Sequence, residues 1–420
     1  MNFPFFLAKR VAASGQKSFA RLIIRIATAA VALSIAVMII ATSLIKGFKS
    51  EISGKMFGFW GHIHVTSTQM TTSFEPSPIN ATPNFMGKLK TIKNVDFTEG
   101  GKSKKTFGGV HHVQSYATKA GIIKTKTNFE GIVLKGVGRD FDWSFVEQNL
   151  VEGRKIMASD TSKDIIISKS TANRLNLKTG NKFVVHFVQN NQQQQKLFQI
   201  CGIYNTGIEE YDKKFALVDL GQVQELLGWN NNQVAGFEVF VDDLRDLKEM
   251  NKYIYNELIT NDLTSQTIKE EQPSIFDWLD LQDVNEWVIL ILMLAVGVIN
   301  MVTALLILIL ERTNMIGTLK AMGATNPSIQ QIFLYYGAII IGIGLLIGNV
   351  VGLGISWLEK TFKFIKLPEA DYYLSYAPIQ FDFLTILGLN ILAFLLTTTF
   401  LLLPTLLVTS ITPVKAIKFK

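Results

Sequence analysis

Cysteine is almost absent from the sequence, which contains only Cys201 among its 420 residues. One thiol cannot form a disulfide within the chain, so the fold does not depend on a disulfide framework. Cys201 lies in the apolar run 197–203. In such a run a free cysteine usually acts as a small buried hydrophobic side chain.

Charged residues are absent from four long segments, at 26–45, 288–310, 321–358 and 383–414. A helix needs roughly 20 apolar residues to cross the hydrocarbon core of a bilayer, which is about 30 Å thick. A charged side chain at the centre of that core costs about 2.5–3.5 kcal/mol on insertion scales. Four such segments, in a chain with 48% hydrophobic residues, predict transmembrane helices rather than buried helices of a large soluble protein.

Recognisable catalytic and cofactor-binding arrangements are also absent. Residues 96–103 are similar to a phosphate-binding loop, but Asp96 stands where the first glycine is needed and no apolar strand leads into the segment. Gly136 and Gly138 lack the third glycine of a dinucleotide-binding turn. Two close pairs of histidines have no third ligand at a spacing suited to a metal ion, namely His62, His64, His111 and His112. We therefore expect a chain that is not an enzyme and that binds neither cofactor nor metal.

The basic residues indicate how the four helices cross the membrane. The excess of positive charge lies at 1–25, 311–320 and 409–420, which four spans place on one side. Basic residues accumulate on the cytoplasmic side of membrane proteins, so we expect both termini there and the long segment 46–283 outside. The basic residues that give the net charge of +7 lie next to the predicted membrane spans. The charge therefore does not indicate a nucleic-acid partner.

The predicted fold is a membrane protein with four transmembrane α-helices in a 1+3 arrangement and a large α+β extracytoplasmic domain inserted after the first helix. Short strands alternate with helices through that domain. The N-terminal residues predict either an amphipathic helix on the cytoplasmic surface or a frayed basic segment. The expected segments are a cytoplasmic N-terminus at 1–21, a first transmembrane helix at 22–45, a periplasmic α+β domain at 46–283, a second transmembrane helix at 284–310, a cytoplasmic helical loop at 311–326, a third transmembrane helix at 327–357, a periplasmic loop at 358–382, a fourth transmembrane helix at 383–408 and a cytoplasmic tail at 409–420.

A polar low-complexity stretch links two predicted strands of the outer domain. It consists of Gln189, Asn190, Asn191, Gln192, Gln193, Gln194 and Gln195. Such residues bury too little apolar surface to pack, which fits an exposed hairpin tip. The alternative is a protruding finger that faces a partner protein.

Three glycines of the third span recur at four-residue spacing, namely Gly344, Gly348 and Gly352. Small residues on one face of a membrane helix allow another helix to approach closely. We therefore expect a helix-packing face here, although glycines also occur freely in membrane helices.

The polar segment 311–326 between the second and third spans predicts a short amphipathic helix. Four apolar side chains fall at i, i+1, i+4 and i+7 and form one stripe, namely Met315, Ile316, Leu319 and Met322. Gly323 is expected to end this helix in a left-handed conformation. Asn326 is expected to be the N-cap of the next span, with Pro327 as its first helical residue. The stripe fits either a helix lying on the bilayer or a helix docked in a groove of a soluble subunit.

Residues 311–324 (ERTNMIGTLKAMGA) resemble the signature of FtsX-like permeases, the membrane subunits of type VII ABC transporters. The tail 410–417 (SITPVKAI) is similar to the closing element of that family. Residues 44–52 (LIKGFKSEI), 57–65 (FGFWGHIHV) and 366–376 (KLPEADYYLSY) resemble the lipoprotein-releasing permeases of the LolC/LolE type. The resemblance extends over nearly the whole chain.

This resemblance implies an inner-membrane subunit of an ABC transporter, with a separate LolD-like cytoplasmic ATPase that uses the ATP. Helix 311–323 is then the coupling helix, which carries the motion of the ATPase into the spans by mechanotransmission. A second permease copy or a paralogue completes the complex. The residues assigned to coupling are Arg312, Met315, Ile316, Leu319, Lys320, Met322 and Gly323.

The LolC/LolE type further implies extraction of lipoproteins from the outer leaflet of the inner membrane and transfer to a periplasmic LolA-like chaperone. In LolC-type members a hairpin captures the chaperone, but its place here holds only 189–195, without prolines or apolar residues. The chain is therefore either a LolE-like partner or captures its chaperone differently. The lipoprotein acyl chains are expected between the first and second spans, near Met38, Met293, Val296 and Asn300.

Two other functions stay open at the level of the sequence. A permease of the MacB type for efflux, or one for cell-envelope signalling, would share the fold and the mechanism. A membrane protein without transport would have no ATPase partner. The sequence also leaves open whether the permease pairs with itself or a paralogue, and which cargo it takes.

Overall fold

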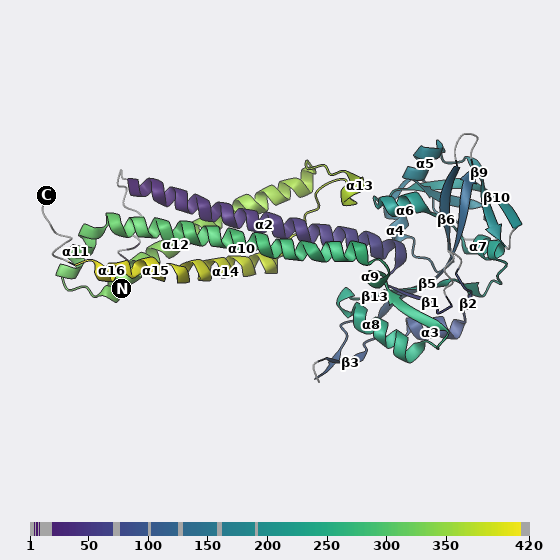
Figure 1. Cartoon of the computed structure of the whole chain (residues 1–420), viewed down its shortest axis with the longest axis horizontal. Helices are drawn as coiled ribbons and strands as arrows, with labels where there is room; N and C mark the ends of the chain where they lie inside the picture. Colours follow the sequence, from purple (N-terminus) through teal and green to yellow (C-terminus); the bar gives the residue numbers. More distant parts are fainter. Residues whose placement is uncertain are drawn as a thin grey trace. The chain divides into compact units, whose positions relative to one another are not determined.

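The computed structural model describes residues 4, 6, 8, 19–69, 76–99, 102–124, 129–157, 162–189 and 192–412. The chain divides into two compact units (Figure 1). The helical unit contains Met1–Ser50, Trp278–Lys366 and Tyr376–Lys420, and the sheet unit contains Glu51–Asp277 and Leu367–Ser375. Most of the predicted N-terminal segment 1–21 and the end of the tail, 413–420, lie outside the described residues.

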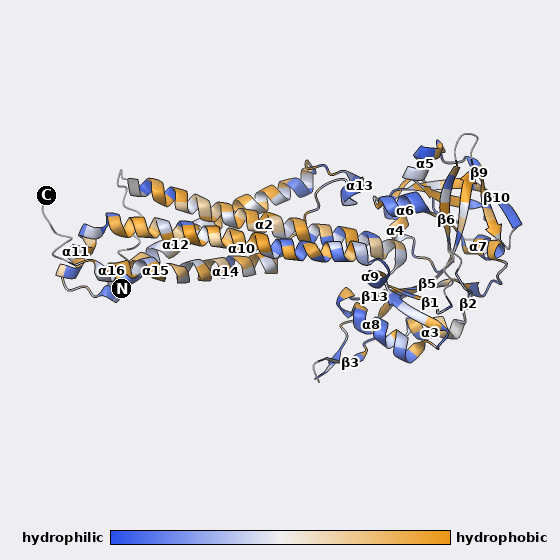
Figure 2. Ribbon diagram, in the orientation of Figure 1, coloured by the Kyte–Doolittle hydropathy of each residue, from blue (hydrophilic) through white to orange (hydrophobic). Residues whose placement is uncertain are grey.

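Four helices within the described part of the chain are long and apolar enough to cross a membrane. Apolar residues extend along most of α12 and α14, whereas the first turns of α10 are mixed with hydrophilic residues (Figure 2). The helices are α2 (Phe19–Trp60), α10 (Pro273–Glu311), α11 (Thr313–Ala321), α12 (Asn326–Phe362), α14 (Phe383–Phe400), α15 (Leu402–Thr405) and α16 (Leu407–Ser410).

Helices α2 and α10 continue well beyond the charge-free segments from which they were predicted. Helix α2 extends to Trp60 and α10 begins at Pro273, so their polar ends belong to the sheet unit. Hydropathy marks only the part of a helix that suits lipid, whereas the backbone hydrogen bonds continue into polar sequence. The last predicted span is interrupted instead: α14 ends at Phe400, and two short helices follow around Pro404, which cannot donate a backbone hydrogen bond.

The three spaced glycines of α12 lie against α2, namely Gly344, Gly348 and Gly352. A Cβ atom at Gly348 would lie 2.6 Å from the carbonyl oxygen of Ala32. At Gly352 the nearest atom would be the Cα of Ala36, at 3.0 Å. The two helices therefore approach so closely that a side chain at these positions would collide with backbone atoms.

Two asparagines join α12 to α14 within the apolar bundle. The Asn349 side-chain amide donates to the Asn390 Oδ1 at 2.6 Å, and the Asn390 amide donates to the Asn349 Oδ1 at 3.0 Å. Each amide also donates to a carbonyl one turn earlier in its own helix. This reciprocal pair satisfies polar groups that lipid could not satisfy.

Ion pairs connect three helices at one end of the helical unit. The Lys46 Nζ lies 2.5 Å from the Asp382 Oδ2, and the Lys49 Nζ lies 2.6 Å from the Asp283 Oδ2. These pairs involve α2, α10 and the N-cap of α14. They begin where the uncharged segment of α2 ends, as expected for the boundary between lipid and water.

The strands of the sheet unit form a ten-stranded sheet and two small two-stranded sheets. The sheet is mixed, because β6 pairs with β11, and β8 with β10, in parallel. The strands are β1 (Ile63–Ser67), β2 (Ile79–Asn80), β3 (Asp96–Glu99), β4 (Lys102–Lys105), β5 (Val110–Lys124), β6 (Phe129–Val137), β7 (Leu150–Gly153), β8 (Asp164–Ser168), β9 (Lys182–Gln189), β10 (Gln192–Tyr204), β11 (Phe215–Asp219), β12 (Gln233–Val234), β13 (Gly236–Val241) and β14 (Leu263–Thr267).

Six of these strands close into a ring. Each strand pairs with the next in the order β5, β6, β11, β8, β10, β9, and β9 pairs again with β5. Ile123, Leu134 and Val185 are fully buried inside this small barrel. Strands β13, β1 and β14 continue the sheet from the first half of β5. Closure of the ring removes free strand edges, which otherwise promote aggregation.

Short helices alternate with the strands of the sheet unit along the sequence. Helix α7 packs on β5 and β6, where a Cβ at Gly136 would lie 2.8 Å from a methyl group of Val223. The helices of the sheet unit are α3 (Pro83–Lys90), α4 (Ser144–Gln148), α5 (Lys169–Leu175), α6 (Glu209–Lys214), α7 (Leu220–Leu227), the 3₁₀-helix η1 (Leu244–Asp246), α8 (Leu247–Tyr253), the π-helix η2 (Ile254–Leu258), α9 (Ile268–Glu271) and α13 (Glu369–Tyr372).

The contact between α2 and α12 predicts the effect of substitution at Gly348. Replacement of Gly348 with leucine forces the helices apart and should destabilise the bundle by about 1–3 kcal/mol, the usual range for overpacking. Gly354 on the same helix has open space around it, so Gly354→Leu is the matched control. Thermal unfolding in detergent should show a lower midpoint for Gly348→Leu alone, and equal midpoints would contradict the close contact.

Candidate functional site

Helix α11 forms a compact turn between two long helices. Only Arg312 separates it from α10. The Ala324 amide donates to the Leu319 carbonyl at 3.0 Å, and Gly323 has a φ of 91°, which is the left-handed geometry that ends many helices. Thr325, not Asn326, is the N-cap of α12, so that helix starts one residue earlier than the sequence indicates.

The apolar stripe expected on α11 is divided between two environments. Ile316 is fully buried and Leu319 is 8% exposed, in the same apolar cluster as Met301 of α10 and Ile329 of α12. Met322, in contrast, is 72% exposed. Ile316 and Leu319 therefore hold α11 against its own bundle, and Met322 is the member of the predicted stripe that lies on the exposed side.

The open side of α11 carries two polar and two apolar side chains. It consists of Asn314, Thr318, Ala321 and Met322, all of which are exposed. We call these residues the open face of α11. A mixed polar surface that ends in one flexible apolar side chain suits a protein groove better than the interior of a bilayer.

Lys320 connects α11 to the C-terminal end of the last helix. Its Nζ donates to the carbonyls of Val408 and Ile411, each at 2.7 Å. These carbonyls lie at the end of α16, where helix carbonyls have no intrahelical partner and favour a cation. Lys320 thus ties α11 directly to the end of the fourth apolar segment.

The low-complexity hairpin has a different structure from the one expected of a polar tip. Gln189 is the last residue of β9, and the glutamines from Gln192 to Gln195 pair with β9 as the start of β10. Cross-strand hydrogen bonds satisfy their backbone groups, so polar composition does not prevent a strand here. Asn190 and Asn191 lie outside the described residues.

Four exposed apolar side chains lie beside this hairpin on one outer face of the barrel. Strand register places them on the same side, because Ile122 is opposite both Gly131 and His186. The side chains are Phe129 (80% exposed), Val188 (62%), Ile122 (49%) and Leu197 (44%). We call these four residues the barrel patch. An apolar cluster of this kind on a soluble surface usually marks a contact with another protein.

The chain matches two family models. The model described as FtsX-like permease C-terminal matches residues 287–413, which include α11. The model described as MacB-like periplasmic core domain matches residues 26–255, more than half of the chain. The chain belongs to the family of FtsX-like permeases with a MacB-like periplasmic core domain.

Full-length relatives agree with this family. The permease is 21% identical to the lipoprotein-releasing system transmembrane protein LolC of Xylella fastidiosa (strain 9a5c), over 93% of this chain and 92% of that protein. It is 22% identical to the corresponding LolE of Haemophilus influenzae, over 92% of both chains. The solved extracellular domain of the noncanonic ABC-type transporter YknZ covers 49% of this chain at 16% identity, with a TM-score of 0.32, a likeness too weak to carry weight.

The permease is therefore a membrane subunit of an ABC transporter, a class of subunit that is not itself enzymatic. Its four apolar helices indicate a multi-pass inner-membrane protein, and its sheet unit corresponds to the periplasmic core domain. Among the residues that the structure describes, no group of three or more histidine, cysteine, aspartate or glutamate side chains could hold a metal ion.

The residues predicted to surround an acyl chain do not share one environment. Met38 is 2% exposed, and Met293 packs against the apolar cluster that contains it. Val296 and Asn300 lie on the exposed side of α10. The structure thus brings the two methionines together inside the bundle and leaves the other two residues on its surface.

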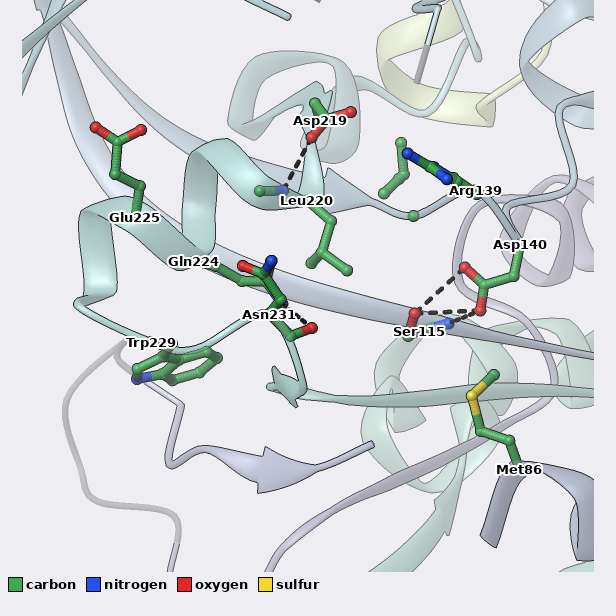
Figure 3. A pocket seen from close by; sticks show the side chains of 13 residues that line it. Met86, Ser115, Arg139, Asp140, Asp219, Leu220, Gln224, Glu225, Trp229 and Asn231 are labelled. Carbon is green, nitrogen blue, oxygen red and sulfur yellow. Dashed lines mark hydrogen bonds between the residues drawn. The ribbon is translucent and has the colours of Figure 1, made fainter. Parts of the chain in front are cut away.

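A cavity of about 630 Å³ opens in the periplasmic core domain beside α7 (Figure 3). Asp219 accepts a hydrogen bond from the Gly221 amide, and Asp140 accepts one from the Ser115 amide, both at 2.9 Å. Gln224 donates to the carbonyls of Asn231 and Gln233, in the segment that follows α7. These polar side chains close the turns of the fold, and we assign the cavity no ligand.

Analysis of the sequence did not identify Ile122 and Phe129 of the barrel patch. They are single apolar residues near the end of β5 and at the start of β6. Their exposure depends on the pairing of β5 with β9, a contact between residues about sixty positions apart, which no local pattern contains.

Proposed function

We propose that this permease subunit extracts lipoproteins from the outer leaflet of the inner membrane and passes them to a periplasmic chaperone. The observation that carries the proposal is that its similarity to lipoprotein-releasing system proteins extends over about nine-tenths of the chain. In this proposal the termini and α11 are cytoplasmic, and a separate ABC ATPase binds and hydrolyses ATP there. A second permease, identical or paralogous, completes the complex.

The open face of α11 is the proposed docking surface for the ATPase. Its Met322 side chain would enter an apolar groove of the partner, while the polar residues Asn314 and Thr318 lie at the rim. Ile316 and Leu319, which are buried in the bundle, would transmit the motion rather than contact the ATPase. The proposed coupling thus passes from Met322 through α11 into α10 and α12.

An ATPase-docking test follows from this difference in exposure. Met322→Asp places a charge in the proposed groove and should reduce co-purification of the ATPase about tenfold or more, as loss of an interface hot spot does. Met157 in the periplasmic core domain is equally exposed, at 72%, and Met157→Asp is the matched control. Leu319→Asp should instead remove the permease from the membrane fraction, because it buries a charge in the bundle. Equal ATPase recovery with Met322→Asp and Met157→Asp would contradict the docking surface.

The barrel patch is the proposed contact for the chaperone. It adjoins the hairpin of β9 and β10, which corresponds in position to the partner-facing finger considered from the sequence. The residues Gln193 and Gln195 on the same outer face are exposed and could provide hydrogen bonds at the rim. Chaperone capture would then depend on the barrel surface rather than on a long projecting loop.

Charged substitutions in the barrel patch should weaken this contact. The double variant Phe129→Asp/Val188→Asp should lower cross-linking to the chaperone about tenfold while ATP hydrolysis by the complex stays unchanged. Leu244 is 44% exposed and follows β13, whose last residue pairs with the opposite end of β5, so Leu244→Asp is a suitable control. Unaltered cross-linking of the double variant would remove the barrel patch from the proposal.

The acyl chains are proposed to lie along the exposed side of α10, at Val296 and its apolar neighbours. Ile291 and Ile299 are 60% and 64% exposed, and they extend this apolar side toward both ends. The buried Met38 and the half-buried Met293 would line it from within. A second permease opposite this side would close the acyl chains off from lipid.

The proposed function is tested by reconstitution in proteoliposomes with the ATPase, an acylated lipoprotein and the soluble chaperone. ATP should drive transfer of the acylated lipoprotein to the chaperone, because the chaperone has to replace the bilayer as the environment of the acyl chains. The same protein without acyl chains is the control and should not be transferred with ATP dependence. ATP hydrolysis without transfer of the acylated form would refute lipoprotein release, although the permease fold would stand.

A further inference from the structure

A cluster of buried charges lies where α2 ends inside the periplasmic core domain. Lys135 of β6 and Glu238 of β13 are both fully buried, and the Lys135 Nζ lies 2.7 Å from the Glu238 Oε1. His64 of β1 is 4% exposed, and its Nδ1 lies 2.7 Å from the Glu271 Oε2. We call Lys135, Glu238, His64 and Glu271 the anchor cluster. Burying a charged side chain costs free energy, so a cluster of buried charges suggests a specific structural role.

Lys135 and His64 of the anchor cluster bind the last carbonyls of α2. The Lys135 Nζ donates to the Phe59 carbonyl at 2.5 Å, and the His64 Nε2 lies 2.6 Å from the Trp60 carbonyl. Carbonyls at a helix C-terminus have no intrahelical partner and carry partial negative charge, which favours cations. The end of α2 is thus held by two side chains from two different strands.

Aromatic side chains of α2 strengthen the contact with Lys135. The Lys135 Nζ lies 4.3 Å from the centre of the Trp60 ring and 4.8 Å from that of Phe59. A desolvated ammonium over an aromatic face contributes to stability in the same way as a weak ion pair. Lys135 therefore joins β6 of the barrel to the final turn of α2 by a hydrogen bond and by its position over two rings.

The start of α10 is connected to the same cluster. Glu271, which binds His64, is the last residue of α9 and lies two positions before Pro273, where α10 begins. The ring of Phe276 in the first turn of α10 lies 5.6 Å from that of Phe57 in α2. The anchor cluster thus binds the end of one long helix and the residues that lead into the other.

The charges of the cluster compensate one another. Burial lowers the pKa of Lys135, and Glu238 opposes that shift. Burial also disfavours protonated His64, but Glu271 and Glu238 outweigh it and raise the pKa of His64 above its ordinary value. Gln114 donates to the Oε2 of Glu238 at 2.6 Å, while the Oε1 faces the Lys135 ammonium in the ion pair.

We propose that the anchor cluster is the positioning device that fastens the end of α2, and the segment leading into α10, to the barrel, so that displacement of these helices moves the periplasmic core domain. This inference rests on the proposed lipoprotein release for its functional consequence. Lys135 is its central positioning residue, since it belongs to β6 and contacts both α2 and β13. Without it, the ATPase cycle would move α2 without a corresponding movement of the barrel.

Lys119 on the neighbouring strand provides a matched control. It is also a buried lysine, 1% exposed, and its Nζ donates to the Val188 carbonyl at 3.3 Å, in the hairpin. Its strand neighbours Gly121 and Ile123 face the barrel interior, so Lys119 lies on the other face of the sheet from Lys135. Lys119→Met removes a buried ammonium from the same domain without affecting the end of α2.

The test measures two quantities on the full complex with its ATPase in lipid. Hydrogen exchange reports the local opening of residues 51–64, and the reconstituted assay reports lipoprotein released per ATP hydrolysed. Lys135→Met should raise exchange in 51–64 and lower release per ATP at least about threefold, while ATP hydrolysis is retained. Lys119→Met should leave exchange in 51–64 and release per ATP near the values of the unmodified protein.

Lys135→Met leaves Glu238 buried without its cation, so the variant can fail to accumulate. The double variant Lys135→Met/Glu238→Gln removes both charges together and avoids an unpaired buried charge. It should show the same increase in exchange and the same loss of release per ATP. General misfolding, in contrast, would reduce ATPase assembly and release in parallel.

The outcomes separate this inference from the proposed function. If the unmodified complex releases lipoprotein and the Lys135 variants release as much per ATP, the inference is overturned. It is also overturned if exchange in 51–64 does not change in the variants. If the unmodified complex hydrolyses ATP but releases no lipoprotein, the proposed function fails, and the exchange measurement still decides whether the cluster fastens α2.

Discussion

Lipid offers no hydrogen-bonding partner, and this constraint governs the polar contacts of the helical unit. The Asn349 and Asn390 amides satisfy each other across α12 and α14. Lys320 binds carbonyls that the short helix α16 leaves without a partner. Each of these contacts joins two helices, so the polar groups that the bilayer tolerates least also hold the helices together.

The same cost of burial applies in the periplasmic core domain, where Lys135 and Glu238 are fully enclosed. A buried ion pair is weak evidence for stability, because an apolar pair of the same volume often stabilises a protein as well. The pair instead fixes a position, because each buried charge finds its partner only when β6 and β13 place both side chains correctly. This pair lies at the end of α2, where Lys135 also donates to the Phe59 carbonyl.

Helix α11 illustrates how one amphipathic pattern can serve two surfaces. The pattern of Met315, Ile316, Leu319 and Met322 indicates a single apolar side, but a short helix between two long ones has to pack on its own bundle first. Ile316 and Leu319 fill that requirement, and Met322 is left exposed at the end of the turn. The division makes α11 part of the membrane domain and at the same time available to a partner.

The sequence alone determined the four apolar helices and the close-packing glycines, because hydropathy and residue size act locally along the chain. It also indicated the family through the residues around α11. Only the tertiary structure decided that Leu319 is buried, that the glutamines near Gln193 are in a strand, and that Lys135 reaches the end of α2. These features depend on contacts between distant segments, such as β5 with β9 and β6 with α2, which no periodicity in the sequence encodes.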